Sequence, residues 1–458
     1  MMEYTIKQLE MWNEKIEKIV AEEGLDCYPQ EFEICNYDDM LCYEAYVGMP
    51  SHYPHWCYGK AYEKQKSLYK YNVTGLPYEM VINADPCIAY LMKDNTLLLQ
   101  ILTIAHVYGH NDFFKNNRLF AEGTMAKSTV EMFKNHADRI RSYIQDPSIG
   151  YAKVERILNA AHALRFQTIR VVGQKDVSDE EKKQRLLEKY YAKIKRDSVL
   201  EKKKDIPFPD LHKIPLEPTE DIMAFIVRHG NLEEWEKDIL CIVIEETKYF
   251  IPQMETKIMN EGWASFWHYT ILNKLALPQD LHMEFLSRHN QVIKPFLGSM
   301  NPYYIGFKIF EDIQERYGRD KIFEVRRLER DESFIRRYLT EELCEKLNLF
   351  QYGKKGLDYV IEEIADEEGW KKIRDTIANN IGMATIPCIQ VEEVSRKDQS
   401  ILLIHQYDGR ELDLNYAYET LKHLATLWGG QVLLRTVVDN VRKLIVCDRN
   451  KKVSMNSK

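Results

Sequence analysis

Hydrophobic residues recur at helical spacing along most of the chain, which predicts a largely α-helical protein. Near the start of the chain, Ile6, Leu9, Ile16 and Ile19 mark one apolar face of a helix that ends near Gly24. The same periodicity predicts further helices over residues 96–116, 124–145, 151–170, 219–230, 232–250, 252–274, 280–294, 301–317 and 319–348.

Short runs with strand-like composition interrupt the helical pattern in two places. The runs "YEMVIN" (78–83) and "CIAYLM" (87–92) are separated by the turn signal Ala84-Asp85-Pro86. After Pro387, the helical pattern "LNYAYETLKHLATLWG" lies between two pairs of such runs, "CIQVEEVS" with "SILLIHQY" and "QVLLRTVV" with "RKLIVCD". These runs predict a minor sheet in the helical body and a small C-terminal β-β-α-β-β domain.

The predicted fold class is therefore α+β, with a mainly α-helical body, a small sheet and a small C-terminal domain. We expect residues 1–173 and 221–384 to form one body and residues 385–458 to form the C-terminal domain. Between the two parts of the body, residues 174–220 are charged and then interrupted by prolines. This composition predicts a solvated helix followed by an extended linker.

Composition and charge narrow the possible classes of function. The chain has 458 residues and a net charge of −8, so it lacks the overall basic character of a nucleic-acid-binding protein. The basic segment 182–204 contains interspersed acidic residues and no recognised nucleic-acid-binding motif. Nine cysteines at irregular spacing give no disulfide framework, which favours a reducing compartment.

The N-terminal sequence has no basic segment followed by an apolar one, so it predicts no secretory signal. The longest apolar run, near Leu97–Ala105, is too short to span a bilayer. We expect a cytoplasmic protein without a membrane span.

Two histidines stand out in the stretch "ILTIAHVYGHNDFF" (101–114). His106 and His110 lie four residues apart in an apolar run, so their imidazoles point the same way from one face of a helix. A pair at this spacing can supply two ligands of one tetrahedral metal ion. Gly109 would let another backbone approach this face closely. In the zinc-binding H-E-x-x-H helix a glutamate follows the first histidine, but here the residue is Val107.

A second polar stripe lies in "IPQMETKIMNEGWASFWHYTIL". Glu261 and His268 share a helical face whose ends are apolar, and aromatic residues occupy the other faces. A buried carboxylate and imidazole need partners, because an unpaired charge in a dry core is costly. One economical arrangement is a divalent metal, most simply zinc, bound by His106, His110 and Glu261. His268 is then a fourth ligand, a residue that supports a ligand, or an acid or base near substrate.

Two further carboxylates are candidates for proton transfer. Glu246 lies on an apolar helical face with Trp235, Ile239 and Ile242, and Glu131 lies in the segment after the histidine helix. The alternative to a metal centre is a packed core in which histidines and glutamates satisfy one another by hydrogen bonds, since pairs of histidines at this spacing also arise by chance.

Four long motifs occur in one order: "MPSHYPHWCYGK", "HVYGHNDFFKNN", "KIMNEGWASFWHY" and "NPYYIGFKIFEDI". Together they resemble the SpoVR family, the stage V sporulation protein R proteins, and the resemblance extends over essentially the whole chain. It implies a part in forming the spore cortex, the peptidoglycan layer of the bacterial endospore. The biochemical activity of the family is poorly defined, so the resemblance implies a cellular setting more readily than a reaction.

A second resemblance is local. "HVYGH" followed by "EGWA" is similar to gluzincin-type zinc metallopeptidases, in which two histidines of one helix and a glutamate of a later helix bind zinc. By this likeness His106, His110 and Glu261 match the ligands, and the small sheet is expected to be zincin-like. Val107 departs from the pattern, because valine cannot accept a proton from water. A base would have to come from Glu246, Glu131 or His268, in that order of preference.

Two functions follow from these patterns. The first is a zinc-dependent hydrolase of a peptide or amide bond, with a peptide, a protein or a cell-wall precursor as substrate. In this hypothesis His268 or Glu246 transfers protons. The second is a non-catalytic scaffold or regulator, in which any metal or His–Glu network is structural. A structural site is closed by four protein ligands, whereas a catalytic site keeps one position open.

Overall fold

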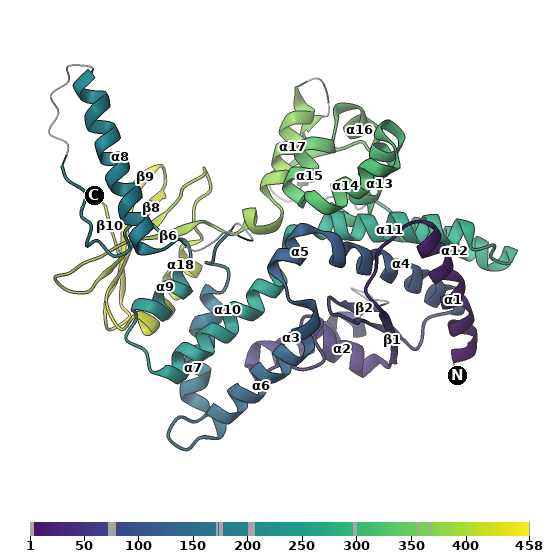
Figure 1. Ribbon diagram of the computed structural model, residues 1–458, viewed down its shortest axis with the longest axis horizontal. Coiled ribbons are helices and arrows are strands. Elements are labelled where there is room, and N and C mark those ends of the chain that lie inside the picture. Colours follow the sequence, from purple (N-terminus) through teal and green to yellow (C-terminus); the bar gives the residue numbers. More distant parts are fainter. Residues whose placement is uncertain are drawn as a thin grey trace. The chain divides into compact units, whose positions relative to one another are not determined.

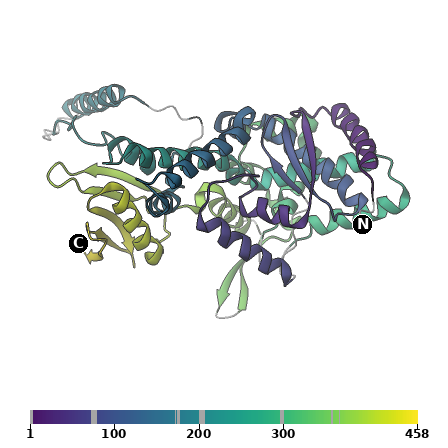
Figure 2. The ribbon, with the colours of Figure 1, turned by 90° about the horizontal axis from the view of Figure 1, so that it is seen from below.

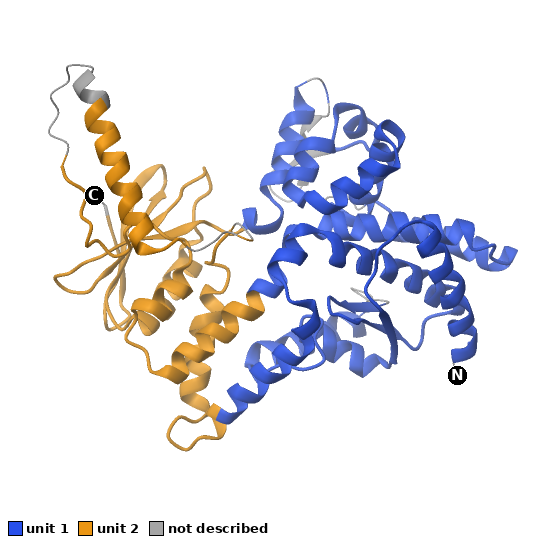
Figure 3. Ribbon diagram, in the orientation of Figure 1, with its two compact units in different colours: residues 1–142, 248–385 blue, residues 143–247, 386–458 orange. Residues whose placement is uncertain are grey.

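The computed structural model describes residues 4–457 except 72–78, 171–172, 174–176, 200–206, 296–299, 356–357, 365 and 367. The chain divides into two compact units, each built from two separate segments (Figure 3). Unit 1 contains residues 1–142 and 248–385, and unit 2 contains residues 143–247 and 386–458. Within the described part of the chain, none of the helices combines the length and the hydropathy that a membrane crossing requires.

Unit 1 is mainly helical, and three helices form its centre: α4 (Leu97–Asn116), α11 (Lys257–Lys274) and α13 (Pro302–Tyr317). Helix α11 packs against both of the others (Figure 1). A Cβ atom added to Gly306 of α13 would lie 2.1 Å from the Ile258 carbonyl oxygen and 2.7 Å from the Gly262 Cα atom of α11. Glycines at these positions therefore allow the two backbones to touch.

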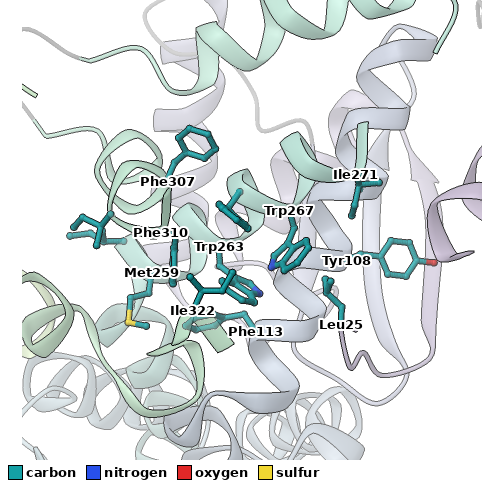
Figure 4. Packing of buried hydrophobic residues seen from close by; sticks show 14 of the residues in the cluster. Leu25, Tyr108, Phe113, Met259, Trp263, Trp267, Ile271, Phe307, Phe310 and Ile322 are labelled. Carbon is teal, nitrogen blue, oxygen red and sulfur yellow. The ribbon is translucent and has the colours of Figure 1, made fainter. Parts of the chain in front are cut away.

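The core of unit 1 surrounds α11. Trp263 and Trp267 are fully buried, and the Trp263 ring centroid lies 5.1 Å from that of Phe310. Figure 4 shows these rings packed with Phe113 of α4 and with aliphatic side chains. Helix α11 is apolar on most of its circumference and is buried along most of its length, as the sequence pattern indicates.

A three-stranded sheet lies beside α4 in the order β1-β3-β2. Strand β1 (Gln30–Cys35) pairs parallel with β3 (Cys87–Met92), and β2 (Glu79–Ile82) pairs antiparallel with β3. The sequence predicts β2 and β3 but not β1. Strand β2 is at the end of the described sheet, and it also contacts α4, which places its first residue near the histidine helix.

The other elements of unit 1 cover this core. The hairpin of β4 and β5, drawn in light green in Figure 2, instead projects away from it. The predicted helix over 319–348 is three shorter helices, because the backbone is extended at Glu329 and Leu339. The elements are α1 (Ile6–Glu22), α2 (Tyr37–Ala45), α3 (Trp56–Lys70), α5 (Arg118–Gly123), α6 (Thr129–Gln145), α10 (Glu234–Glu255, its last part), α12 (Gln279–Val292), α14 (Arg319–Leu328), α15 (Asp331–Tyr338), α16 (Glu341–Lys346), β4 (Phe350–Lys355), β5 (Asp358–Ile364) and α17 (Gly369–Asn379).

Unit 2 is built on a five-stranded sheet in the order β10-β9-β8-β7-β6. Strands β7 and β8 pair parallel and are joined by α18 (Leu414–Trp428), whereas the other pairs are antiparallel. The predicted β-β-α-β-β order is present, with β10 as an additional strand. The strands are β6 (Ile389–Val394), β7 (Ile401–His405), β8 (Val432–Val438), β9 (Val441–Cys447) and β10 (Val453–Ser457).

The segment before α10 belongs to unit 2 rather than to the helical body. Helix α7 (Tyr151–Leu164) packs against α18, and Phe225 of α9 (Ile222–His229) stacks on Trp428 with ring centroids 6.0 Å apart. Apolar contacts with the C-terminal domain therefore place residues 143–247 in unit 2. This division differs from the predicted boundaries at residues 173 and 221. Helix α8 (Asp179–Val199) and a segment of turns and bends over 207–220 occupy the predicted linker, part of which lies outside the described residues.

Candidate metal centre

Helix α4 presents two imidazoles on one face. Thr96 caps its N-terminus by accepting a hydrogen bond from the Leu99 amide, and residues 98–114 are all buried. His106 and His110 lie one turn apart with their ring planes nearly perpendicular and their ring centroids 4.6 Å apart. As the i, i+4 spacing predicts, the rings of His106 and His110 lie on one face of the helix.

Helix α11 brings Glu261 to the same place. A Cβ atom on Gly109 would lie 2.6 Å from the Ala264 Cα atom, so the glycine permits the predicted close approach of a second backbone. Glu261 Oε2 lies 3.8 Å from His106 Nε2 and 3.6 Å from His110 Nε2. The three residues predicted to bind a metal therefore converge on one point.

These separations are longer than those of ordinary hydrogen bonds. A hydrogen bond between an imidazole nitrogen and a carboxylate oxygen spans about 2.7–3.2 Å, so 3.6 and 3.8 Å are too long. Two ligand atoms at about 2.0–2.1 Å from a tetrahedral zinc ion lie about 3.3–3.4 Å apart. His106 Nε2 and Glu261 Oε2 are both buried and have no hydrogen-bond partner. Buried polar atoms normally have one, so this pair fits a shared cation.

A second carboxylate, Glu79 of β2, completes the cluster and was not predicted. Its Oε1 atom lies 3.8 Å from His106 Nε2, and ligand atoms of Glu79, His106 and His110 all lie within 4.8 Å of one another. Burial, supported by the nearby Glu261 carboxylate, raises the pKa of Glu79. The only signal in the sequence is an acidic residue in the strand-like run "YEMVIN". The separation between Glu79 and His106 along the chain matches neither helical nor strand periodicity.

Tyr303, at the start of α13, also faces this cluster. Its ring is stacked beside that of His106, with centroids 6.1 Å apart. The negative charge of Glu261, followed by burial, raises the pKa of the Tyr303 phenol well above its usual value. The hydroxyl group therefore remains protonated and is a hydrogen-bond donor at neutral pH.

Each histidine of the pair has a partner for its other ring nitrogen. His110 Nδ1 lies 2.9 Å from Asn260 Oδ1, and His106 Nδ1 lies 2.9 Å from His268 Nδ1. Because Asn260 Oδ1 can only accept, His110 donates from Nδ1 and keeps the lone pair on Nε2. Burial, together with the neighbouring His106, lowers the pKa of His110 to about 4, so the ring is neutral and able to bind a cation.

The charge state of Glu261 also suits a ligand. Burial by itself would raise the pKa of Glu261, but the imidazoles of His106 and His110 outweigh it and the pKa is lowered. Glu261 is therefore ionised at neutral pH. Two neutral imidazoles and an ionised carboxylate form a donor set suited to zinc and to other divalent transition metals.

Of the remaining predicted residues, His268 lies beside the cluster, whereas Glu131 and Glu246 do not. His268 is in contact with His106 through Nδ1 and is fully buried on α11. Glu131 is exposed in the first turn of α6, and Glu246 is buried in the part of α10 that belongs to unit 2. Neither of these carboxylates is among the described groups that surround His106. Val107 is buried and apolar, so it supplies no base, and Glu79 of β2 lies 3.8 Å from His106 Nε2.

Comparisons with known proteins identify the family. A family model described as "SpoVR like protein" matches residues 3–386, and one described as "SpoVR-like C-terminal domain" matches residues 387–439. The chain belongs to the SpoVR family. The two SpoVR matches meet next to residue 386, where the C-terminal segment of unit 2 begins. The predicted family resemblance is thus confirmed.

A curated relative covers nearly the whole chain. It is "Uncharacterized protein YcgB" of Escherichia coli (strain K12), which is 33% identical over 475 residues, corresponding to 94% of this chain and 92% of that protein. No solved structure matches the chain at a significant level. The predicted likeness to zinc metallopeptidases therefore rests on the sequence motifs alone.

Proposed function

We propose that this SpoVR-family protein is a metal-dependent hydrolase whose zinc ion is held by His106, His110 and Glu261. One observation carries the proposal: two buried, unpartnered ligand atoms, His106 Nε2 and Glu261 Oε2, lie at a separation suited to sharing a cation. A zinc ion bound there supplies a Lewis acid and lowers the pKa of water toward about 7.

The surrounding residues support hydrolysis of a peptide or amide bond. Glu79 is a carboxylate with a raised pKa beside the imidazole pair, so it is suited to accept a proton from the attacking water in place of the glutamate that Val107 replaces. Tyr303 stays protonated and is suited to donate a hydrogen bond to the oxyanion that develops on the substrate. The family name favours a substrate connected with the spore cortex, such as a cell-wall precursor or a protein that regulates its assembly.

The test is metal content. Purified protein is loaded with zinc and freed of excess metal by gel filtration. Its zinc content per chain is then measured by inductively coupled plasma mass spectrometry. We expect one zinc per chain in the wild type and a loss of stoichiometric zinc in His106→Ala and Glu261→Ala, because each removes a ligand. His282→Ala on α12 is the matched control and should keep its zinc. Unchanged zinc in both ligand variants would exclude the site.

A non-catalytic scaffold is the second candidate, and the fourth group of the cluster favours it. If Glu79 is a ligand rather than a base, two imidazoles and two carboxylates close the site, as in structural zinc sites. The substitution Glu79→Gln separates the two functions. For a hydrolase we expect the variant to retain zinc, and acetohydroxamic acid to bind the cobalt-substituted wild-type protein and change its visible absorption. Loss of zinc from Glu79→Gln, with no response to the hydroxamate, would establish the scaffold.

A further inference from the structure

Three buried imidazoles form a continuous hydrogen-bonded chain that begins at the candidate metal centre. His106 Nδ1 lies 2.9 Å from His268 Nδ1, and His268 Nε2 lies 2.7 Å from His289 Nδ1. The three residues come from α4, α11 and α12, and each is at most 3% exposed. Both distances are within the range of direct hydrogen bonds, so no water separates the rings.

The last ring of this hydrogen-bonded chain, His289, is enclosed by aromatic side chains. The centroid of the His289 ring lies 4.6 Å from that of Tyr269, 5.1 Å from that of Phe307 and 6.0 Å from that of Phe285. Burial, followed by the charge of Lys308, lowers the pKa of His289 to about 4. The His289 ring is therefore neutral at physiological pH.

The two contacts together give the hydrogen-bonded chain a direction. Each contact holds one proton, and a ring whose Nδ1 accepts carries its proton on Nε2, so if His106 donates to His268, then His268 donates to His289. The direction depends on His106 Nε2. A proton on this buried atom would find its carboxylate neighbours, Glu79 and Glu261, at 3.8 Å, too far to accept a hydrogen bond. Nε2 therefore carries the lone pair, and His106 donates from Nδ1.

We propose that His268 and His289 are positioning residues that hold His106 in the tautomer whose bare Nε2 faces the two carboxylates, preset to bind a divalent cation. The proposal rests on the proposed metal site and adds to it the means by which the tautomer and the angle of one ligand are set. His268 accepts from His106 and donates from Nε2 to His289. Such partners of a ligand raise its basicity and fix its orientation.

The first experiment reads the tautomers directly in metal-free protein. Long-range ¹H–¹⁵N correlation spectra of the full chain, with histidine labelled in ¹⁵N, distinguish a protonated Nδ1 from a protonated Nε2. We expect His106 to carry its proton on Nδ1, and His268 and His289 to carry theirs on Nε2. Assignment comes from His268→Gln and His289→Gln, which each remove one set of signals. A proton on Nε2 of His106 would reverse the chain and overturn the proposal, whether or not zinc binds.

The second experiment measures zinc affinity by competition with a chelating dye. His268→Phe keeps an aromatic ring but removes both hydrogen bonds, and we expect it to weaken zinc binding by about 10–100-fold. His268→Gln retains an acceptor and a donor and should restore most of the affinity. His282→Gln, on the same helix as His289, is the matched control and should leave the affinity unchanged.

Equal affinity in the wild type and in His268→Phe would overturn the positioning role while leaving the metal site intact. If His268→Phe does not fold, His289→Phe is measured instead, because it removes only the last hydrogen bond inside an aromatic enclosure. A smaller loss of affinity is then expected, and no loss would contradict the proposal. Failure of the wild-type protein to bind zinc would refute the proposed function. The tautomers measured in the first experiment would still show in which direction the three histidines donate their hydrogen bonds.

Discussion

At the scale of single residues, the cluster solves a problem created by Val107. A buried valine beside His106 leaves α4 without a carboxylate that could act on water. Glu79 brings a carboxylate to the same imidazole from a different element, at 3.8 Å. In the proposed hydrolase, residues on α4 and α11 bind the cation and the residue on β2 takes the proton, whereas one helix combines the two roles in H-E-x-x-H proteins.

The buried histidines make the metal-free protein sensitive to acid. The pKa values of His110 and His289 are about 4 in the folded chain, below the ordinary 6.5, chiefly because both are buried. Between pH 6.5 and 4 these two rings bind protons in the unfolded chain but not in the folded chain, so their contribution to stability is full above 6.5 and falls as the pH decreases. Each such imidazole contributes a slope of about 1.4 kcal/mol per pH unit.

Urea denaturation of metal-free protein at several pH values between 7.5 and 4.5 measures this slope. We expect His289→Gln to reduce it by the equivalent of one proton, whereas the half-buried His282→Gln leaves it unchanged. Equal pH slopes in the wild type and in His289→Gln would mean that His289 takes up its proton at the same pH in the folded and the unfolded chain.

At the scale of elements, the site depends on how closely α4 and α11 approach. Gly109 lies between His106 and His110 in the chain and touches the Ala264 backbone, one turn from Glu261. The close contact therefore occurs within the site itself. The approach of two backbones, rather than the flexibility of any loop, brings the carboxylate within 3.6 Å of an imidazole.

The substitution Gly109→Ala should move the two helices apart. Its Cβ atom would lie 2.6 Å from the Ala264 Cα atom, so the packing must shift, at a cost of about 1–3 kcal/mol in the free energy of unfolding. We also expect weaker zinc binding, because His106 and His110 move away from Glu261.

Gly59→Ala is the matched control for this substitution. Gly59 lies inside α3, and an added Cβ atom there meets no atom within 4 Å, so a gain of about 0.5–1 kcal/mol is expected. Denaturation curves and zinc titrations of both variants provide the measurement. Unchanged zinc affinity in Gly109→Ala would show that the site tolerates a change in helix separation.

At the scale of the whole molecule, the candidate site belongs entirely to unit 1. Its residues come from both segments of that unit, with Glu79, His106 and His110 in the first and Glu261 and Tyr303 in the second. The intervening residues 143–247 fold with the C-terminal sheet instead. The body is therefore not a continuous stretch of chain, and the site exists only when its two segments are assembled.

Zinc should consequently stabilise the two units unequally. A ligand that binds the folded state at 100 times its dissociation constant adds about 2.7 kcal/mol to the stability of the unit that binds it. In hydrogen exchange followed by mass spectrometry, we expect zinc to slow exchange in α4, α11 and β2 and to leave β7, β8 and α18 unchanged. Equal protection of the C-terminal sheet would show that the cation stabilises both units together.

The sequence by itself determined the elements with strong local signals. Periodicity predicts α4 and α11, and it also predicts which faces carry His106, His110 and Glu261, because side chains three or four residues apart on a helix must lie on one face. The long motifs determined the family. The C-terminal β-β-α-β-β order likewise followed from alternating strands around one amphipathic helix, apart from the additional β10.

Tertiary structure alone decided which faces meet. Glu79, Tyr303 and His289 join the cluster and its histidine chain from a strand and two helices that have no spacing relation to α4. Local patterns indicate that a side chain is buried, but its partners depend on the packing of helices and strands that are distant in sequence. The division into units was decided in the same way, because apolar contacts with α18 hold α7 and α9 to the C-terminal sheet.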